Sequence, residues 1–373
     1  MRIGVEANAY YKNIAGTGMY SRNIVNIWRK EGKEIFLFVN KRQSIMDLAK
    51  KKNIFTRLLN GIKDILWMQI ILPIVLKKNK IDILFCPAFI SPMFSTCPTI
   101  VTIHDMSFLR YPETCDRLFG FYLKILLFLT KKRINIFLTD SDFSKKEIHR
   151  LLKVPQEKIK IVYAGCDKKF KIIKNLNKIR KVKKEYGINQ RFILNVGTLE
   201  PRKNIITLIM AFDILKKKEL IEHKLVLCGG KGWYYDNILR KIRELKIENE
   251  IIFTGYVPDD DLPLLYNAAE LFVYPSLYEG FGLPVLEAMS CGCPVVTSNV
   301  SSLPEIVGNA GILVDPLDVE DLAQTMLKVL KDRDLRKDLV KRGLEQAKVF
   351  SWGKAAKETF KLLEGAFVTI QHV

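Results

Sequence analysis

The chain has 373 residues, 48% of them hydrophobic, and its Lys and Arg residues outnumber Asp and Glu by 60 to 40. This length exceeds what a single hydrophobic core usually supports, so we expect two domains, and the composition excludes a disordered chain. The net charge of +20 favours phosphate-bearing partners such as nucleotides, lipid diphosphates, nucleic acid or an anionic membrane, although a lysine-rich surface without such a partner gives the same count.

In the first 168 residues, short apolar runs alternate with longer amphipathic ones. This alternation is typical of a parallel sheet covered by helices on both faces. We predict strands at Arg2–Asn8, Glu34–Val39, Ile81–Pro87, Thr99–Asp105, Ile134–Ser141 and Lys158–Ala164, and helices at Met19–Lys30, Gly61–Lys78, Leu118–Lys132 and Phe143–Leu152.

Residues 169–190 are rich in Lys and Asn, and we interpret them as a linker with one helical piece around Ile179–Tyr186. The alternation then resumes over residues 191–351. Strands are predicted at Phe192–Gly197, Lys224–Cys228, Ile251–Tyr256, Leu271–Pro275, Pro294–Ser298 and Gly311–Val314, and helices at Asn204–Lys217, Tyr234–Leu245, Asp259–Ala268, Pro284–Met289, Ser302–Val307, Asp318–Lys328, Leu335–Val349 and Trp352–Phe367.

The fold class is therefore α/β, with two Rossmann-like, doubly wound domains. Ligands of such sheets bind beyond the carboxyl ends of the strands, so we expect the site in a cleft where the two domains face each other.

The seven cysteines show no zinc-ligand spacing and favour a cytoplasmic location. Met1 leads directly into a strand, so we expect no signal peptide, and no uncharged apolar run reaches the roughly 20 residues that span a bilayer.

The sharpest motif spans residues 275–289, where a strand ends, a loop with Gly280 and Gly282 follows, and a helix begins at a proline. The glycines let the backbone approach a ligand, and the free N–H groups of the helix start favour an anion. Glu279 and Glu287 flank this positive end and can accept hydrogen bonds from sugar and ribose hydroxyls. Acidic residues that serve only as dipole partners of the helix would give the same pattern.

Arg202 and Lys203 form the second motif, between the strand that ends at Gly197 and the helix that begins at Asn204. Helix starts prefer acidic residues, so two cations conflict with the local electrostatics, and such conflicts are typical of functional sites. A bound diphosphate would resolve the conflict, with Arg as a forked donor and Lys as a point charge. A solvent-exposed pair of cations is the structural alternative.

Two weaker motifs lie in the first half. Gly16 and Gly18 form a Gly-x-Gly loop before a helix, without the third glycine of a dinucleotide fingerprint, so NAD binding is not supported. His104 follows the fourth strand, and Asp105 beside it could orient the imidazole or cap a turn.

Ser141 is typical of a helix cap. We interpret the three acidic residues at 259–261 as a cap cluster and expect no metal site.

Taken together, the motifs resemble glycosyltransferase family four, a retaining family with the GT-B fold. The match covers nearly the whole chain, in the expected order, except that Ala164–Asp167 departs from the family's usual turn. The elements that carry it are Gly16–Gly18, His104–Asp105, Asp140–Ser141, Gly197–Thr198, Arg202–Asn204, Gly229–Gly230, Gly255–Val257 and Glu279–Glu287.

The resemblance implies a role for each matched residue. Arg202 and Lys203 would hold the donor diphosphate and stabilise it as it leaves, Glu287 would bind the donor ribose, and His104 would contact the donor sugar. Segment 352–373 would cross back to the first domain. Catalytic roles are implied for His104, Arg202, Lys203 and Glu279, and donor binding for Gly16, Gly18, Gly197, Arg202, Lys203, Val257, Glu279, Gly280, Phe281, Gly282, Leu283 and Glu287.

Residues 102–114 and 229–235 resemble those of polysaccharide mannosyltransferases, which implies GDP-mannose as the first choice of donor and UDP-sugars as the next. The acceptor would be a saccharide or lipid-linked saccharide in the synthesis of lipopolysaccharide or another surface polysaccharide, with no cofactor and no nucleic acid as partner. Basic, apolar helices at Gly61–Lys78 and Leu118–Arg133 suit an enzyme peripheral to the inner membrane face, and ordinary core helices fit equally well. A nucleotide-sugar epimerase or hydrolase of the same fold and a non-enzymatic basic binding protein are the alternatives.

Overall fold

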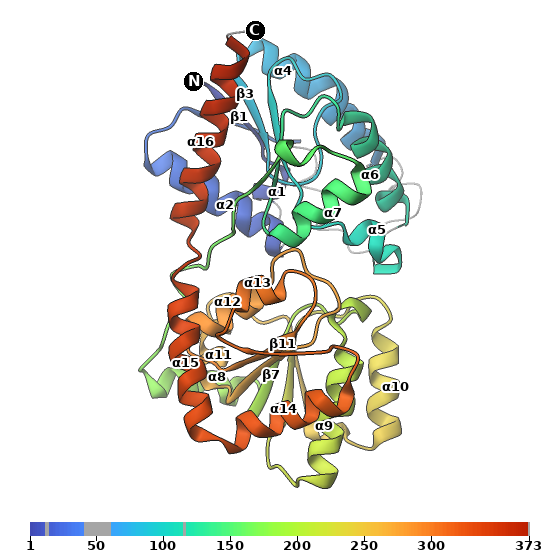
Figure 1. Ribbon diagram of the computed structural model, residues 1–373, viewed down its shortest axis with the longest axis vertical. Coiled ribbons are helices and arrows are strands. Elements are labelled where there is room, and N and C mark those ends of the chain that lie inside the picture. The colour runs from blue at the N-terminus through green and yellow to red at the C-terminus, as the bar shows by residue number, and fades with distance from the viewer. Residues whose placement is uncertain (12–14, 41–60, 115–116, 372–373) are drawn as a thin grey trace. The chain divides into compact units, whose positions relative to one another are not determined.

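The computed structural model describes residues 1–11, 15–40, 61–114 and 117–371 (Figure 1). The chain forms two compact units. Unit 1 comprises Met1–Leu109, Asp116–Ala164 and Trp352–Val373, and unit 2 comprises Arg110–Cys115 and Gly165–Ser351. Each unit contains a six-stranded sheet whose neighbouring strands are all parallel. The predicted fold class is confirmed.

The sheet of unit 1 has the strand order β2-β1-β3-β4-β5-β6. Its strands are β1 (Ile3–Glu6), β2 (Ile35–Phe38), β3 (Ile83–Cys86), β4 (Thr99–Thr102), β5 (Ile136–Thr139) and β6 (Ile159–Ile161). Its helices are α1 (Asn8–Tyr11), α2 (Ala15–Lys30), α4 (Leu72–Lys78), α5 (Ser107–Arg110), α6 (Arg117–Thr130), α7 (Asp142–Leu152) and α16 (Trp352–Gln371). Residues 61–66 are also helical, and a π-helical segment, Trp67–Ile71, joins them to α4.

The sheet of unit 2 has the strand order β12-β11-β10-β7-β8-β9. Its strands are β7 (Phe192–Val196), β8 (Lys224–Cys228), β9 (Ile251–Gly255), β10 (Leu271–Tyr274), β11 (Val295–Ser298) and β12 (Ile312–Val314). Its helices are α8 (Leu176–Glu185), α9 (Ile205–Lys218), α10 (Tyr235–Leu245), α11 (Leu262–Ala268), α12 (Leu283–Ser290), α13 (Leu303–Val307), α14 (Val319–Lys331) and α15 (Arg333–Ala347).

All twelve predicted strands are confirmed, most of them one to three residues shorter at an end. The short helices α1 and α5 were not predicted, because four residues carry too little apolar periodicity to show a helix. The last helix, α16, packs in unit 1 although it follows unit 2 in the chain. Trp28 of α2, fully buried, donates its indole N–H to the carbonyl oxygen of Ala356 at 2.9 Å and so fastens the helix there (Figure 1).

The strand order of unit 2 decides where its loops come together. From β7 the chain moves outward through β8 to β9, and then restarts on the other side of β7 with β10, β11 and β12. Because crossovers between parallel strands are right-handed, this reversal places α9 and α10 on one face and α12 and α13 on the other. The loops that follow β7 and β10 therefore leave the same sheet edge in opposite directions, which is where doubly wound sheets bind ligands.

Candidate functional site

The loops after β7 and β10 are tied to each other at this edge of unit 2. The backbone N–H of Leu277 donates to the carbonyl oxygen of Arg202 at 2.8 Å, and the hydroxyl of Ser276 donates to the same oxygen at 3.0 Å. Two of the sequence motifs, separated by more than seventy residues, are thereby brought into one site.

Arg202 and Lys203 are neutralised by carboxylates of the protein itself. The Lys203 ammonium lies 2.6 Å from Oε1 of Glu279, while the Arg202 guanidinium lies 3.2 Å from Oε2 of Glu279 and 2.8 Å from Oε1 of Glu200. These four side chains are between 9% and 14% exposed. The two cations do lie next to the start of α9, which begins at Ile205, close to its predicted start, and Glu200 and Glu279 balance their charges within the protein.

Glu279 is surrounded by donors. Its Oε1 also accepts hydrogen bonds from the Tyr274 hydroxyl at 2.9 Å and the Ser276 hydroxyl at 2.6 Å, and the Tyr274 hydroxyl lies 2.5 Å from Nζ of Lys203. Burial alone raises the pKa of Glu279, but the charges of Lys203 and Arg202 outweigh burial and lower that pKa to about 2. Burial lowers the pKa of Lys203, against the attraction of Glu279. The result is a pre-organised, water-poor cluster of two cations and two carboxylates.

Glu287 lies in a contrasting environment, in the second turn of α12 rather than the first. It is 7% exposed, and its Oε2 accepts one hydrogen bond from the hydroxyl of Tyr266 at 3.1 Å. Burial raises the pKa of Glu287 to about 8, against the Tyr266 hydrogen bond, which lowers it. The two glutamates of the motif therefore differ in protonation at neutral pH, with Glu279 ionised and Glu287 mostly protonated.

Two serines hold the loop between these glutamates. The hydroxyl of Ser302 donates to the carbonyl oxygens of Glu279 at 3.0 Å and Phe281 at 2.9 Å, and the hydroxyl of Ser301 accepts from the N–H of Glu279 at 3.2 Å. Gly282 then turns the chain into α12 with φ of 109°, in the left-handed region that favours glycine. The predicted helix Ser302–Val307 begins at one of these serines, and nothing in their spacing indicates a partner twenty residues upstream.

Gly197 and Gly229 pack backbone against backbone at the ends of β7 and β8. Their φ angles are 153° and 150°, and a Cβ atom on Gly229 would lie 1.9 Å from the carbonyl oxygen of Gly197. The N–H of Gly197 donates to Cys228 at 2.8 Å, and that of Gly229 donates to Gly255 at 2.9 Å. Val257, 7% exposed, follows Gly255 closely along the same edge.

His104 belongs to unit 1 and lies beyond the end of β4. Its Nδ1 is 2.5 Å from Oδ2 of Asp140, and its Nε2 is 3.0 Å from the carbonyl oxygen of Pro87. Two acceptors require a proton on each ring nitrogen. Burial by itself lowers the pKa of His104, but the Asp140 carboxylate outweighs burial and raises it. Both contacts therefore favour the protonated form of the ring, the imidazolium.

Asp105 does not orient this imidazole. Its Oδ1 accepts a hydrogen bond from the N–H of Ser107 at 2.8 Å, so Asp105 caps a turn, the second of the two predicted roles. Asp140, directly after β5, orients the ring instead. The strand order offers the missing signal, because β4 and β5 are neighbours and their ends meet. Ser141 accepts from the N–H of Ser144 at 3.1 Å and caps α7, as predicted.

Two further expectations are wrong. Gly16 and Gly18 lie in the first turn of α2, which begins at Ala15, rather than in a loop before the helix. The acidic residues at 259–261 do not cap α11: Asp261 makes no side-chain capping bond and accepts from the Tyr186 hydroxyl at 3.0 Å, while Asp259 pairs with Lys169. In the described ranges, no group of three or more His, Cys, Asp or Glu residues is arranged to hold a metal ion.

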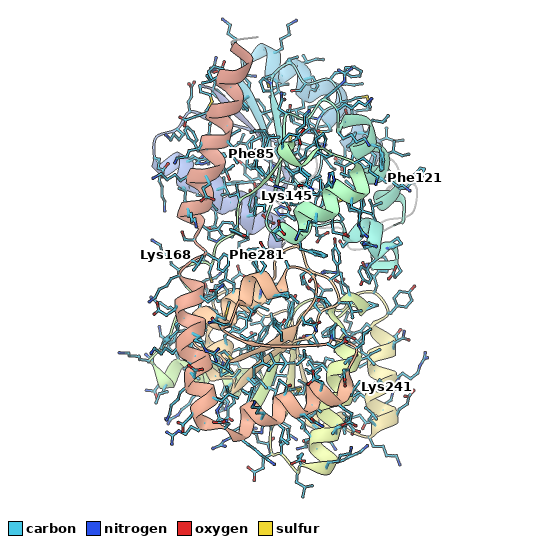
Figure 2. The ribbon with its side chains drawn as sticks, viewed as in Figure 1. Phe85, Phe121, Lys145, Lys168, Lys241 and Phe281 are labelled. Carbon is cyan, nitrogen blue, oxygen red and sulfur yellow. The ribbon has the colours of Figure 1, made fainter. Side chains whose placement is uncertain are left out.

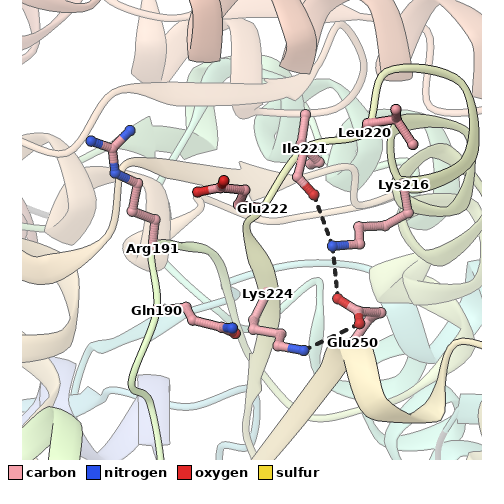
Figure 3. Close-up of a pocket in the computed structure, with 8 residues that line it drawn as sticks. All are labelled: Gln190, Arg191, Lys216, Leu220, Ile221, Glu222, Lys224 and Glu250. Atoms are coloured by element: carbon pink, nitrogen blue, oxygen red, sulfur yellow. Dashed lines mark hydrogen bonds and ion pairs between the residues drawn. The ribbon is translucent and has the colours of Figure 1, made fainter.

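A pocket of about 580 Å³ lies at the opposite edge of the second sheet, away from these loops (Figure 3). Glu250 in its wall pairs with Lys216 at 2.8 Å and Lys224 at 3.2 Å. The lining comes from the segments just before β7, β8 and β9 and from the end of α9. Since doubly wound sheets bind ligands beyond the carboxyl ends of their strands, this pocket is not the candidate site.

Two Rossmann-like sheets, with a buried Arg–Lys–Glu cluster at the carboxyl end of the second, are the arrangement of the GT-B fold. Residues 14–170 match the model of Glycosyltransferase Family 4, and residues 177–346 match that of Glycosyl transferases group 1. Over 268 residues the chain is 41% identical to the O-antigen chain mannosyltransferase B of Escherichia coli, which covers 71% of this chain and 70% of that protein. The chain belongs to glycosyltransferase family four, which confirms the resemblance.

Two further similarities fit this assignment. The serotype-specific mannosyltransferase WbdA of Escherichia coli is 35% identical over 219 residues, 58% of this chain, which spans only 27% of the length of that protein. The crystal structure of HepE from Anabaena in complex with UDP-glucose covers 98% of this chain and 100% of its own, with a TM-score of 0.75 and 18% sequence identity. At that identity, the structural match supports the fold alone.

Proposed function

We propose that this glycosyltransferase moves mannose from GDP-mannose, with retention of anomeric configuration, to a saccharide or lipid-linked saccharide during the synthesis of lipopolysaccharide or another surface polysaccharide at the inner face of the cell membrane. The 41% identity to an O-antigen chain mannosyltransferase, over 71% of the chain, carries this proposal. A second mannosyltransferase at 35% identity supports the same sugar.

In the proposed reaction, Arg202 and Lys203 stabilise the charge that develops on the departing diphosphate. Their geometry is set in advance by Glu279 and Glu200 at 2.6–3.2 Å, so no reorganisation is needed when the leaving group gains charge. Each cation shares its charge with a carboxylate, and a diphosphate that approaches brings further negative charge to both cations. The acceptor hydroxyl forms the new bond to the anomeric carbon, the bond to the diphosphate breaks, and the hydroxyl proton passes to the departing phosphate.

The role of Glu279 in this scheme follows from its hydrogen bonds. Because its Oε1 already accepts from Lys203, Tyr274 and Ser276, it acts first by positioning the two cations. Its Oε2, which lies 3.2 Å from the Arg202 guanidinium, and the backbone of residues 280–283 are proposed to contact the donor sugar. Glu287, mostly protonated at neutral pH, is proposed to bind the ribose. His104, Gly16 and Gly18 supply the proposed contacts from unit 1.

A thermal-shift screen with GDP, UDP, GDP-mannose and UDP-glucose tests the donor, since selective binding raises the melting temperature by mass action. We expect GDP and GDP-mannose to give the largest shifts. A shift produced by UDP and UDP-glucose alone would refute the choice of donor while leaving the enzyme class intact. Analysis of the products formed without acceptor then separates a transferase from the alternatives. Release of free mannose at the rate of transfer measured with acceptor would indicate a hydrolase. Formation of an epimerised nucleotide sugar would indicate an epimerase.

A further inference from the structure

Helix α6 in unit 1 is apolar on two opposite faces. One face packs into the core through Leu123, Leu126 and Leu127, which are at most 4% exposed. The other face presents Phe121 and Leu129 at 64% and 55% exposed, with Ile125 and Phe128 between them. A helix that is apolar all round is normally covered on all sides. Figure 2 shows Phe121 at the outer edge of unit 1, away from its sheet.

A second apolar stripe runs along residues 61–78. Ile62, Leu66, Ile70 and Ile74 follow one another at intervals of four residues, which places them on one side of the helix, and they are 46%, 45%, 53% and 62% exposed. The opposite side of this segment is buried through Met68, Leu72 and Leu76. This segment therefore repeats the two-faced pattern of α6.

One contact joins the two helical segments directly, and two others link them through the loop at residues 93–94. The side chain of Gln69 accepts from the N–H of Met93 at 2.7 Å and hydrogen-bonds to Tyr122 of α6. The Arg133 guanidinium, just beyond α6, lies 4.4 Å from the ring centroid of Phe94, which is 58% exposed. We name the combined surface the apolar platform. Its members are Ile62, Ile65, Leu66, Ile70, Ile71, Ile74, Phe94, Phe121, Ile125, Phe128 and Leu129.

Positive charge surrounds the apolar platform. Residues 61–80 and 117–133 contain nine Lys or Arg residues and a single acidic residue, Asp64. Lys77, Lys78, Lys124 and Lys132 are exposed, and Lys131 lies 4.5 Å from the ring centroid of Phe128. Among the described residues, no helix combines the length and apolar character needed to span a bilayer. An apolar face with a basic rim is instead the composition of a surface that lies in the interface of an anionic bilayer.

We propose that the apolar platform docks the enzyme on an anionic phospholipid bilayer, with α6 and residues 61–78 lying in the interface and the Lys and Arg rim contacting lipid phosphates. Charge complementarity selects this occupant, since two segments with nine Lys or Arg residues and a single acidic residue suit a sheet of anionic headgroups. The inference extends the proposed function, because a lipid-linked acceptor is presented at the same surface, but the docking itself requires no donor and no acceptor.

Flotation of the full chain with vesicles tests the docking. Vesicles of phosphatidylcholine with phosphatidylglycerol should carry the protein upward, and vesicles of phosphatidylcholine alone should carry much less of the protein. High salt should weaken the binding to the anionic vesicles. The double variant Ile74→Ser/Phe121→Ser should reduce partition to anionic vesicles by about tenfold or more, because both side chains lose their burial in the interface.

The matched control is Leu176→Ser/Leu220→Ser, which removes two side chains of unit 2 that are 61% and 78% exposed, and it should bind vesicles like the wild type. Both double variants should keep wild-type circular dichroism and wild-type transfer to a short, water-soluble acceptor. Equal vesicle binding by the platform variant and the wild type would overturn the proposal. So would a self-association, measured by sedimentation velocity, that disappears in the platform variant while vesicles bind neither protein.

Discussion

The ammonium nitrogen of Lys203 lies 2.6 Å from Oε1 of Glu279, and both residues are less than 10% exposed. Replacing Glu279 by Gln leaves Lys203 and Arg202 adjacent, with Glu200 as the carboxylate that remains in the cluster. We expect Glu279→Gln to lower the free energy of unfolding by about 3 kcal/mol, because an uncompensated charge then stays buried. Urea unfolding monitored by fluorescence measures this loss.

A double-mutant cycle separates this coupling from a general packing defect. In Lys203→Met/Glu279→Gln both members of the ion pair are gone, so we expect a smaller loss than the sum of the two single losses. Asp334→Asn, which breaks a solvent-exposed pair with Lys337, should change stability little. Additive losses in the cycle would contradict the coupling between Lys203 and Glu279.

The hydroxyl of Tyr274 is predicted to position the two charged groups. It lies 2.5 Å from Nζ of Lys203 and 2.9 Å from Oε1 of Glu279. Tyr274→Phe keeps the ring and removes both hydrogen bonds, so we expect kcat for mannosyl transfer to fall about tenfold, with KM for the donor nearly unchanged. Tyr266→Phe, which removes the hydroxyl next to Glu287, should instead raise the donor KM. Steady-state kinetics distinguishes the two, and a lower stability with unchanged kcat for Tyr274→Phe would argue for a merely structural hydroxyl.

Much of the fold was predictable because its signals are local. Buried parallel strands are continuous apolar runs, and Pro and Gly mark where helices begin and end, so the sequence predicts β10, its loop and α12 nearly in place. The two-glycine loop was also interpretable, since Gly282 does adopt a left-handed φ. Short helices such as α1, and the start of α2 four residues before its predicted start, lack such signals.

Partners distant in the chain were not predictable. Lys203 looks unpaired in the sequence because Glu279 is seventy-six residues away and reaches it only through the pairing of β7 with β10. Asp140 is likewise thirty-six residues from His104. Composition and periodicity give strands and helices, whereas the order of strands in the sheet decides which strand ends meet, and so decides the electrostatics of the site.

His104 provides a pH-dependent test, because Asp140 raises its pKa above the ordinary value of 6.5. A raised pKa contributes stability that is complete below 6.5 and is lost as the pH rises through the folded-state value. We expect an NMR titration to show that the His104 imidazole stays protonated above pH 6.5. That signal should move to lower pH in Asp140→Asn. An unchanged titration in this variant would contradict the pairing.

Glu287 should change stability in the same direction as His104, over a lower pH range that begins at 4.5. Its folded-state pKa of about 8 lies above the ordinary value of 4.5, so the folded protein holds a proton that the unfolded chain releases, and stability should fall as the pH rises from 4.5 towards 8. Glu287→Gln keeps the shape and removes the titration. We expect its unfolding free energy to vary less with pH over this range, by on the order of 3 kcal/mol, in urea titrations. If the unfolding free energy of Glu287→Gln varied with pH in the same way as that of the wild type, the proton would belong to another group.

Adjacent glycines offer the sharpest steric test of the site's backbone. A Cβ on Gly229 would lie 1.9 Å from the carbonyl oxygen of Gly197, and its φ of 150° is unfavourable for any side chain, whereas a Cβ on Gly230 meets no atom within 4 Å. Gly229→Ala must therefore push apart the ends of β7 and β8, with a loss on the order of 3 kcal/mol or more in the free energy of unfolding. It should also weaken binding of the donor, whose proposed site includes Gly197. Gly230→Ala should stay near wild type in both measurements. Thermal unfolding with and without GDP reports both quantities, and equal behaviour of the two variants would show that β7 and β8 do not approach each other as closely as described.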